Sequence, residues 1–537
     1  MRYRDLCPTL GVTVLIGLIA CGEARAQVTL QVSDFAALPV TGSFSGGTGN
    51  PGSLARVNVM RPEPGSSGRL WVNDLNGPLY LLDPTTRSFT TYLNFNGRDA
   101  HPGLFDRFTF AAGFANGLIT FQFDPDYLAN GKFYTLHLED PAVNGSRAPD
   151  ATSVPGLSVD GYEPTVAETT PGALFRESVI IEWTDTNIRN ATFEGTAREI
   201  LRIQLNTQIH PTGDLIFNPT ARRGDPDWRV LYIGAGDGGS GEQKNLTMRH
   251  NPQRLDTLVG KILRIVPDPA ERQATSRLSP NGRYRIPRDN PFAGVAGARG
   301  EVWAYGFRNP HRLTWVVDAA RPSNNRLLAM SIGMHTWETI NIVHKGANYG
   351  YSEREGNEAM VMTNLTEPRP ANDRLPVRVT DTVTRGTVAP TYPVLQYNHG
   401  MGLAILGGVL YQGTRLPALR GKFIFGDIAT GRLYYTEYAD LLKADDGKPD
   451  TMAEVKNISL RWDDPADTPD TGVQPFPTMN PIVVAGYEAR KRATPGVQSG
   501  PRPTRADIRL AVDASGELYV LSKVDGMIRA VVAATAE

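Results

Sequence analysis

Hydrophobic residues along the chain fall mostly into short runs, and Gly, Pro, Asn or Asp bounds each run. Long stretches with apolar residues at helical spacing are rare. Short runs rich in aromatic and β-branched residues between turn formers are typical of strands. The clearest runs lie at residues 68–72, 131–135, 228–233, 300–305, 421–427 and 516–521. The pattern predicts an all-β protein rather than alternating βαβ units.

The same unit, a turn followed by a short aromatic strand and another turn, recurs along the whole chain. Small sheets that cannot bury their own faces favour a β-propeller. We expect a single propeller domain of six blades over residues 35–535, with long loops inserted between strands. A large sandwich or two all-β domains are the alternatives.

Several segments interrupt the repeat. Residues 28–60 read as an entry strand followed by a Gly/Ser-rich loop at Thr41–Ser53. Asp140–Arg176 and Leu365–Val388 are polar insertions, which we expect to be surface loops rimming the propeller. Tyr487–Thr504 is basic and proline-rich, and it reads as a connector before the final strands.

Charge excludes some classes of partner. The chain has 537 residues, with 55 Lys and Arg against 56 Asp and Glu, and no basic arm or stripe. Nucleic acid is therefore not an expected partner. Beyond the N-terminus no apolar run approaches the roughly 20 residues of a membrane span, so we expect no transmembrane segment in the mature chain.

The N-terminus has the pattern of an export signal. Arg2 and Arg4 precede the apolar run Leu10–Ala20, and Ala24-Arg25-Ala26 offers a small-residue cleavage site. We expect residues 1–26 to be a signal peptide and the mature protein to be periplasmic or secreted. The alternative is a lipoprotein signal with a lipid anchor at Cys21. Both cysteines, Cys7 and Cys21, lie in this segment, so no disulfide is expected in the mature part.

The most informative stretch runs from His210 to Gly239. His210 sits in a Pro-Thr-Gly turn, two β-type runs follow at Asp214–Phe217 and Arg229–Ile233, and Asp237 lies in a glycine turn. Both polar residues should lie on loops just outside a sheet, where functional side chains gather. His210 could act as a base oriented by Asp237. The alternative is two ordinary hairpin turns with polar tips.

An ordered set of further motifs accompanies this stretch along the chain. They are Phe123-Asp124-Pro125-Asp126-Tyr127, Gly236-Asp237-Gly238-Gly239, Gly260-Lys261-Ile262-Leu263-Arg264-Ile265, Ile286-Pro287-Arg288-Asp289-Asn290-Pro291-Phe292, Tyr305-Gly306-Phe307-Arg308-Asn309-Pro310, Gly346-Ala347-Asn348-Tyr349-Gly350-Tyr351 and Gly407-Gly408-Val409-Leu410-Tyr411. With them the chain resembles the glucose/sorbosone dehydrogenase family of six-bladed propellers, which includes soluble quinoprotein glucose dehydrogenase and the aldose sugar dehydrogenases. Members use pyrroloquinoline quinone (PQQ) and calcium.

The resemblance implies roles for individual residues. His210 falls where the family carries the base that takes the C1 hydroxyl proton of a sugar, and Asp237 where it carries the carboxylate partner. Arg308 matches an arginine beside the quinone and the substrate oxygen, where a permanent charge stabilises a developing anion. Asn309 would hydrogen-bond the cofactor.

Other cofactor positions depart from the family pattern. PQQ carries three carboxylates and calls for several cations. The family's Tyr-Lys-Gly lysine is replaced here by Gln412, and Arg505 and Arg509 match the family's paired arginines only with a shift. The resemblance assigns calcium to the backbone carbonyls of Gly333 and Met334, since oxygen donors suit that ion.

Two histidines outside these motifs are read as loop residues. His335 follows the expected calcium carbonyls, and His399 precedes the Gly407-Gly408 strand and could reach the cleft. The leading hypothesis is an exported PQQ-dependent aldose dehydrogenase that passes electrons to an external acceptor. The alternatives are a non-catalytic propeller of the same lineage that binds a glycan or a protein, and a calcium-dependent lactone or ester hydrolase.

Overall fold

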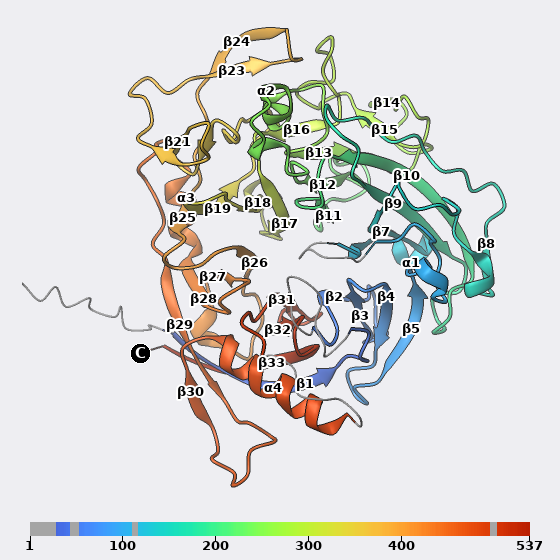
Figure 1. Cartoon of the computed structure of the whole chain (residues 1–537), viewed down its shortest axis with the longest axis vertical. Coiled ribbons are helices and arrows are strands. Elements are labelled where there is room, and N and C mark those ends of the chain that lie inside the picture. The colour runs from blue at the N-terminus through green and yellow to red at the C-terminus, as the bar shows by residue number, and fades with distance from the viewer. Residues whose placement is uncertain (1–27, 43–52, 110–115, 495–501, 537) are drawn as a thin grey trace, which may run out of the picture.

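The computed structural model describes residues 28–42, 53–109, 116–494 and 502–536, and the expected signal peptide with Cys7 and Cys21 lies outside these residues. Most of its strands form six blades arranged in a ring, and the fifth and sixth blades are joined into one sheet through β29 and β1 (Figure 1). The all-β, six-bladed expectation is confirmed.

Each blade runs from an inner strand at the axis to an outer strand at the rim. From the inner to the outer strand, the first blade consists of β2 (Val57–Pro62), β3 (Leu70–Asp74), β4 (Pro78–Leu82) and β5 (Phe89–Asn94), and the second of β6 (Leu118–Phe123), β7 (Lys132–Glu139), β9 (Arg176–Asp185), β10 (Gly195–Leu205) and β8 (Leu157–Ser158). The third blade consists of β11 (Thr212–Phe217), β12 (Leu231–Ala235), β13 (Lys261–Ile265) and β16 (Val302–Tyr305), and the fourth of β17 (Asn309–Val316), β18 (Arg326–Ile332), β19 (Trp337–Ile342) and β25 (Leu395–Asn398). The fifth blade consists of β26 (Ile405–Leu410), β27 (Lys422–Asp427), β28 (Leu433–Glu437) and β29 (Lys456–Trp462), and the sixth of β31 (Ile508–Val512), β32 (Leu518–Ser522), β33 (Met527–Ala536) and β1 (Val28–Ala37).

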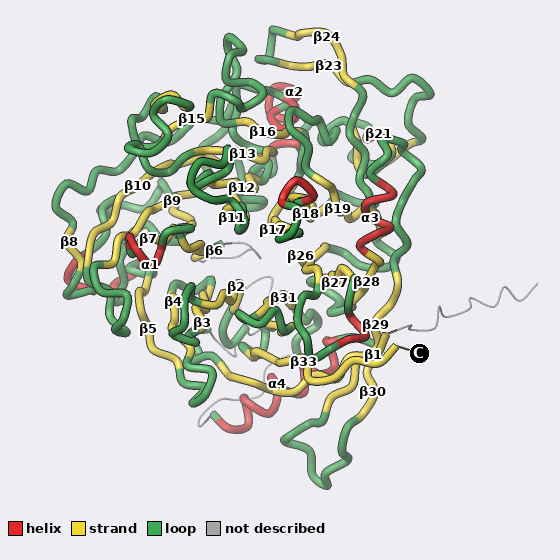
Figure 2. Tube along the Cα trace, turned by 180° about the vertical axis from the view of Figure 1, so that it is seen from behind, coloured by secondary structure: helices red, strands yellow, loops and turns green. Residues whose placement is uncertain are grey.

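The ring is closed by the first described strand. β1 pairs antiparallel with β33 and so becomes the outer strand of the sixth blade, and it also pairs in parallel with β29 of the fifth. The entry strand expected within residues 28–60 therefore forms. Figure 2, seen from behind, shows β1 running along the outside of β33.

Hydrophobic packing explains why the strands read as continuous apolar runs. Every residue of β3, β4, β12, β13 and β32 is buried, because a blade packs against a neighbour on each face. Six hydrophobic clusters lie between adjacent blades, for example Trp71 with Phe133 and Tyr232 with Ala329. The core is thus divided into wedges rather than concentrated at one centre.

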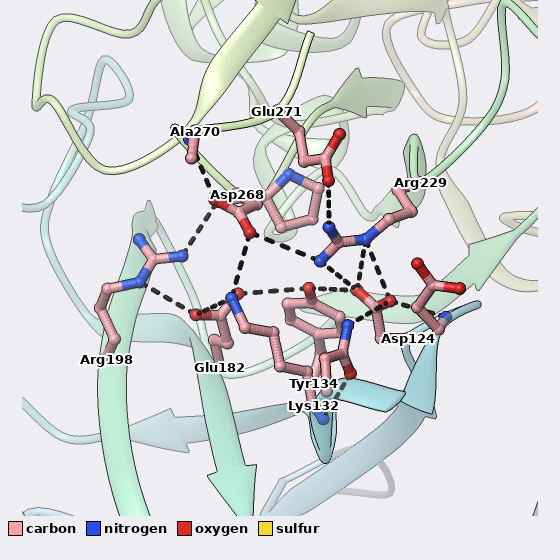
Figure 3. A network of polar contacts seen from close by, with 12 residues as sticks. Asp124, Lys132, Tyr134, Glu182, Arg198, Arg229, Asp268, Ala270 and Glu271 are labelled. Atoms are coloured by element: carbon pink, nitrogen blue, oxygen red, sulfur yellow. Dashed lines mark hydrogen bonds and ion pairs between the residues drawn. The ribbon is translucent and has the colours of Figure 1, made fainter. Parts of the chain in front are cut away.

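Charged residues join the second and third blades (Figure 3). Arg229 donates to both carboxylate oxygens of Asp124, at 3.0 Å each, and lies 2.7 Å from Glu271. Lys132 bridges Glu182 and Asp268 at 3.4 and 3.2 Å. A buried pair of this kind costs several kcal/mol when one partner alone is removed, so the network fixes these two blades to each other.

The remaining elements lie in insertions. They are β14 (Ser276–Leu278), β15 (Arg285–Pro287), β20 (Arg354–Glu355), β21 (Glu358–Met360), β22 (Thr366–Glu367), β23 (Leu375–Arg378), β24 (Thr384–Val388), β30 (Gln474–Phe476), α1 (Tyr127–Asn130), α2 (Leu246–Arg249), α3 (Tyr438–Ala444) and α4 (Met479–Ala493). No helix in the described ranges is long and apolar enough to span a bilayer.

Three segments depart from the sequence prediction. The Leu365–Val388 insertion, expected to be a loop, contains β22 and the antiparallel hairpin β23–β24. The Asp140–Arg176 insertion contributes β8, which adds a fifth strand to the second blade, and so it is not wholly loop. Part of the expected Tyr487–Thr504 connector is helical, because α4 is capped by Thr478 and its last turn is basic, which suits the negative end of a helix dipole. The connector prediction was therefore wrong for residues 487–493. Residues 495–501 of that connector lie outside the described ranges.

Candidate functional site

A cavity of about 260 Å³ lies at the axis. We call it the central cavity. It is lined by residues at or just before the N-terminal ends of the six inner strands. All six inner strands therefore begin at the same end of the ring. Its polar lining includes Asn58, His210, Arg308, Asn309, His311, Arg312, Arg505, Asp507, Arg509 and Lys523.

His210 reaches this cavity from the turn before β11. Its backbone is left-handed, with a φ of 51°, a conformation that residues other than glycine adopt infrequently. The side chain is one-tenth exposed, and its Nδ1 lies 2.8 Å from Oδ1 of Asp237. The two predicted runs after His210 form the hairpin β11–β12. The structure thus brings together the two residues that the sequence placed 27 positions apart.

Asp237 is fully buried, and backbone amides hold its carboxylate in place. The N–H groups of Gly239 and Gly241 donate to its two oxygens at 2.9 Å each. The glycines are required here, since Gly239 has a φ of 73° and a Cβ on Gly241 would lie 2.3 Å from the Tyr351 ring. The glycine turn therefore fixes the carboxylate that orients His210.

Arg308 lies beside this pair. The backbone N–H of Asp237 donates to the Arg308 carbonyl at 2.8 Å, and the guanidinium donates to Glu242 and to the carbonyl of Gly333. Burial opposes the charged form of Arg308, but the nearby Tyr351 and Glu242 outweigh it and raise its pKa. Arg308 is thus a permanent cation at the cavity wall.

Glu242 is the residue that sequence reasoning missed. It ends a short 3-10 turn, Ser240–Glu242, directly after the glycine turn. Its Oε1 accepts from Nε of Arg308 at 2.9 Å and lies 3.8 Å from Nδ1 of His210. The only signal in the sequence is an acidic residue five positions after Asp237. Glu242 connects the histidine and the arginine of the site.

The lining of the cavity carries an excess of positive charge. Arg312, Arg505, Arg509 and Lys523 join Arg308 there, and Asp507 is the one carboxylate among the described lining residues. Asp507 accepts from Nε of Arg505 at 2.9 Å. The two predicted arginines, Arg505 and Arg509, therefore reach the cavity, and Lys523 is a further cation that the sequence analysis did not single out.

Two features of the cavity lining favour a ligand that carries both carboxylates and a hydrogen-bond donor. Burial, followed by the charge of Arg509, holds the pKa of Lys523 well below its usual range, with Asp507 opposing the shift. Oδ1 of Asn309 is buried and has no hydrogen-bond partner in the described part of the chain. Carboxylates of a ligand would balance the positive charge around Lys523, and a hydrogen-bond donor on the same ligand would pair with Oδ1 of Asn309.

Gln412 does not lie at the central cavity. It follows the C-terminal end of β26, whereas the cavity is lined from the N-terminal side of that strand. Its side chain is exposed and donates to the Val317 carbonyl at 3.5 Å. Because six strand residues span about 20 Å, the side chain belongs to the opposite end of the blade. The structure therefore corrects the assignment of Gln412 to the cofactor site.

Gly333 and Met334 lie in the loop between β18 and β19. The Gly333 carbonyl accepts a hydrogen bond from Arg308, and the Met334 N–H donates to Oε1 of Glu355 at 2.7 Å. The loop is anchored by Glu355, whose Oε1 also accepts from three following amides, those of His335, Thr336 and Trp337. Within the described residues no group of three or more His, Cys, Asp and Glu side chains could hold a metal.

The two loop histidines lie apart from the His210–Asp237 pair. His399 sits 3.0 Å from Oε1 of the buried Glu338, which raises the pKa of its imidazole. Glu338 also accepts from the N–H of Gly333 at 3.3 Å. His399 therefore supports the loop under Arg308 and does not line the cavity, and His335 is fixed through its backbone.

Comparison with known proteins bears on this geometry. Residues 196–458, which include His210, Asp237 and Arg308, match the family model described as Glucose / Sorbosone dehydrogenase. Over this segment, which makes up just under half of the chain, the sequence is similar to that family. The recognition made from the sequence motifs is confirmed.

Individual relatives are distant. The HIPL1 protein of Arabidopsis thaliana is 25% identical over 388 residues, which cover 69% of this chain and 50% of the relative. Quinoprotein glucose dehydrogenase B of Acinetobacter calcoaceticus is 23% identical over 366 residues, covering 64% and 61%. The chain thus spans about half the length of the first curated relatives it matches.

A solved structure supports the fold. The apo-form of the soluble aldose sugar dehydrogenase from Escherichia coli superposes with a TM-score of 0.52 at 16% identity, covering 95% of this chain and all of that one. At this identity the likeness extends to the fold alone.

Proposed function

We propose that this protein oxidises the C1 hydroxyl of an aldose, using PQQ held in the central cavity. The observation that carries the proposal is the His210–Asp237 pair, 2.8 Å apart, at the wall of a cavity that is also lined by five Arg and Lys side chains. A base and a fixed cation beside an anion-binding chamber are what a sugar dehydrogenation requires.

The residues of the cavity fit PQQ. Its three carboxylates would be held by Arg505, Arg509 and Lys523, and the unpaired Oδ1 of Asn309 would accept from a cofactor N–H. When bound, PQQ supplies an electrophilic quinone carbonyl that accepts hydride. The protein's contribution is then to position the sugar and to remove its proton.

His210 would take that proton through Nε2. Its Nδ1 faces the carboxylate of Asp237, so Nδ1 carries the hydrogen and Nε2 keeps a free lone pair. Asp237 cannot turn away, because Gly239 and Gly241 hold both of its oxygens. When His210 becomes protonated, the adjacent carboxylate stabilises the imidazolium.

Arg308 would stabilise negative charge on the sugar oxygen as the C1–H bond weakens. Its guanidinium is buried and kept charged, and Glu242 and the Gly333 carbonyl fix its direction. A cation held in place before the reaction needs no reorganisation while charge develops. Glu242 therefore acts as a positioning residue for Arg308.

Calcium would bind through the carbonyls of Gly333 and Met334 together with cofactor oxygens. Oxygen donors suit the ion, but the Gly333 carbonyl already accepts from Arg308. Binding of the ion would have to replace that hydrogen bond. The proposal for calcium thus depends on PQQ providing the remaining ligands.

The site would work outside the cytoplasm, given the signal-type N-terminus, and would pass its electrons to an external acceptor. The test is to add PQQ and Ca²⁺ to purified protein and to measure dye reduction with a panel of aldoses. We expect reduction that requires both PQQ and the sugar. Protein that binds PQQ but reduces no dye with any aldose would contradict the proposal, and a non-catalytic binding propeller would replace it.

A further inference from the structure

A second, larger cavity of about 670 Å³ opens between the third and fourth blades. We call it the aromatic groove, because Tyr232, Trp303 and Trp315 stand in its wall. Blades 3 and 4 lie side by side in Figure 1, with β12 and β16 on one side and β17 and β18 on the other. Its volume falls within the range of about 300–1,000 Å³ typical of ligand sites.

The groove lies at the opposite end of the blades from the central cavity. β11 begins just after His210 and ends just before the groove residue Asn218, and β17 begins beside Arg308 and carries Trp315 near its other end. Strands of this length span about 20 Å. The groove is therefore a separate site, and its residues take no part in the chemistry proposed above.

The three aromatic rings lie next to one another, with Tyr232 nearly perpendicular to both indoles. The Tyr232 ring stands edge-on to Trp303 at 5.9 Å and 88°, and edge-on to Trp315 at 5.5 Å and 81°. Both indoles are only partly buried. Each indole face is electron-rich and attracts the weakly positive C–H groups of a sugar ring.

Polar groups surround the three rings. Asp227 accepts from the Tyr232 hydroxyl at 2.9 Å and from Arg264 at 2.9 Å, and Asp445 lies 2.7 Å from the His344 ring. The remaining polar lining residues are Asn218, Thr220, Asp225, Asp289, Asn325, Arg326 and Lys345. Carboxylates and amides beside an aromatic face are suited to paired sugar hydroxyls, which both donate and accept.

The charges of the lining residues favour a neutral ligand over an ionic one. The lining contains four aspartates against three Arg and Lys side chains, so the groove is nearly balanced. Two of those cations already lie over the Trp303 ring, Arg264 at 4.8 Å and Lys345 at 5.7 Å from its centroid. A cationic ligand such as a quaternary ammonium would meet like charge on that indole.

We propose that the aromatic groove is a binding site for a neutral glycan, which stacks a pyranose ring on Trp315 and hydrogen-bonds to the acidic and amide side chains around it. The site would hold the protein on an oligosaccharide while the opposite end of the ring remains open. It is independent of the proposed oxidation, because no groove residue lines the central cavity.

The test is calorimetric titration of the full chain with three neutral hexasaccharides, maltohexaose, cellohexaose and laminarihexaose. We expect saturable binding of at least one. Trp315→Leu, which keeps apolar volume but removes the flat indole, should weaken binding at least about 10-fold. Trp228→Leu is the matched control, since this half-buried tryptophan of the adjacent blade does not line the groove.

Separation from the central site is tested in the same way. His210→Ala should bind the hexasaccharide as tightly as the unmodified protein, whether or not the protein proves to be a dehydrogenase. Binding that His210→Ala abolishes and Trp315→Leu retains would overturn the proposal. So would binding of choline with no binding of any of the three sugars, which would make the groove a cation cage.

Discussion

The central cavity and the aromatic groove are built on the same strands but differ in chemistry. The cavity carries five Arg and Lys side chains against one aspartate, whereas the groove carries three against four and adds three aromatic rings. β17 joins them, with Asn309 at one end and Trp315 near the other. One blade scaffold thus presents an anion-binding end and a neutral, ring-binding end.

The difference follows from where each site sits on the blade. Inner strands start around the axis, so one residue from each of several blades can point into a shared chamber, and like charges accumulate there. The groove lies between two blades, where the hydrophobic wedge of Tyr232, Trp303 and Trp315 comes to the surface. Placement on the ring, more than the local sequence, decides the kind of ligand.

The sharpest way to separate the two ends is to remove one histidine from each. His210→Ala should lower kcat by about 10²–10⁴-fold, because a general base contributes this much, while PQQ binding is largely retained. His344→Ala, in the groove, should leave kcat unchanged. Steady-state dye reduction measures both. Equal losses in the two variants would show that His210 has no special role.

Glu242→Gln should have the next largest effect. The substitution keeps the shape of the side chain but removes the charge that directs Arg308, and hydrogen bonds to charged groups are worth about 1.5–3 kcal/mol. We expect kcat/KM to fall by roughly 10-fold or more, with the fall mainly in kcat. Glu353→Gln, which pairs with Arg378 away from both sites, is the control. A variant with unchanged kcat would show that Arg308 needs no positioning.

Lys523→Gln should weaken PQQ binding by about 10-fold through loss of a charge-assisted contact, whereas Lys345→Gln in the groove should not. The pKa of Lys523 is lowered by burial, then by Arg509, with Asp507 opposing and Arg56 and Arg312 adding to the lowering. Below that pKa the ammonium is charged and binds a carboxylate, and above it the contact is lost.

PQQ affinity should therefore fall as pH rises through the lowered pKa of Lys523, and this step should be absent from Lys523→Gln. Fluorescence or calorimetric titration of PQQ across a pH series measures it. Identical pH profiles for the variant and the unmodified protein would exclude Lys523 from the cofactor site.

The smallest expected effect belongs to Gln412→Lys. This change restores the lysine that the family pattern places in a Tyr-Lys-Gly step. Since Gln412 is exposed at the far end of β26, the PQQ dissociation constant should stay within about twofold, the size of a surface substitution of up to about 0.5 kcal/mol. A markedly tighter complex would mean that the ligand extends to that end of the ring.

Much of this architecture could be predicted from the sequence, because strand-forming runs and turn residues are local signals. The hairpin after His210 and the glycine turn at Asp237 formed where the pattern indicated. The helix at Met479–Ala493 was missed, since a basic, proline-containing stretch gives a weak helical signal until packing of Ile482, Val483 and Tyr487 against the fifth and sixth blades decides it.

The composition of the site was less predictable. Glu242 and Lys523 are single polar residues in turns, and only the closing of the ring shows which turns meet at the axis. The position of Gln412 shows the converse, since a motif step can be matched in the sequence while its side chain lies at the other end of a strand. The aromatic groove joins Tyr232, Trp303 and Trp315 from two blades, and no spacing in the sequence links them.

The closure of the sixth blade by β1 also has a kinetic consequence. The pairing of β1 with β33 joins the first and the last described strands. Contacts of such high sequence separation slow folding. Until β1 has paired, β33 presents an unpaired edge that could recruit the β1 of a second molecule, as in domain swapping. β1 also pairs with β29, so one strand connects the fifth and sixth blades and helps to keep the ring closed.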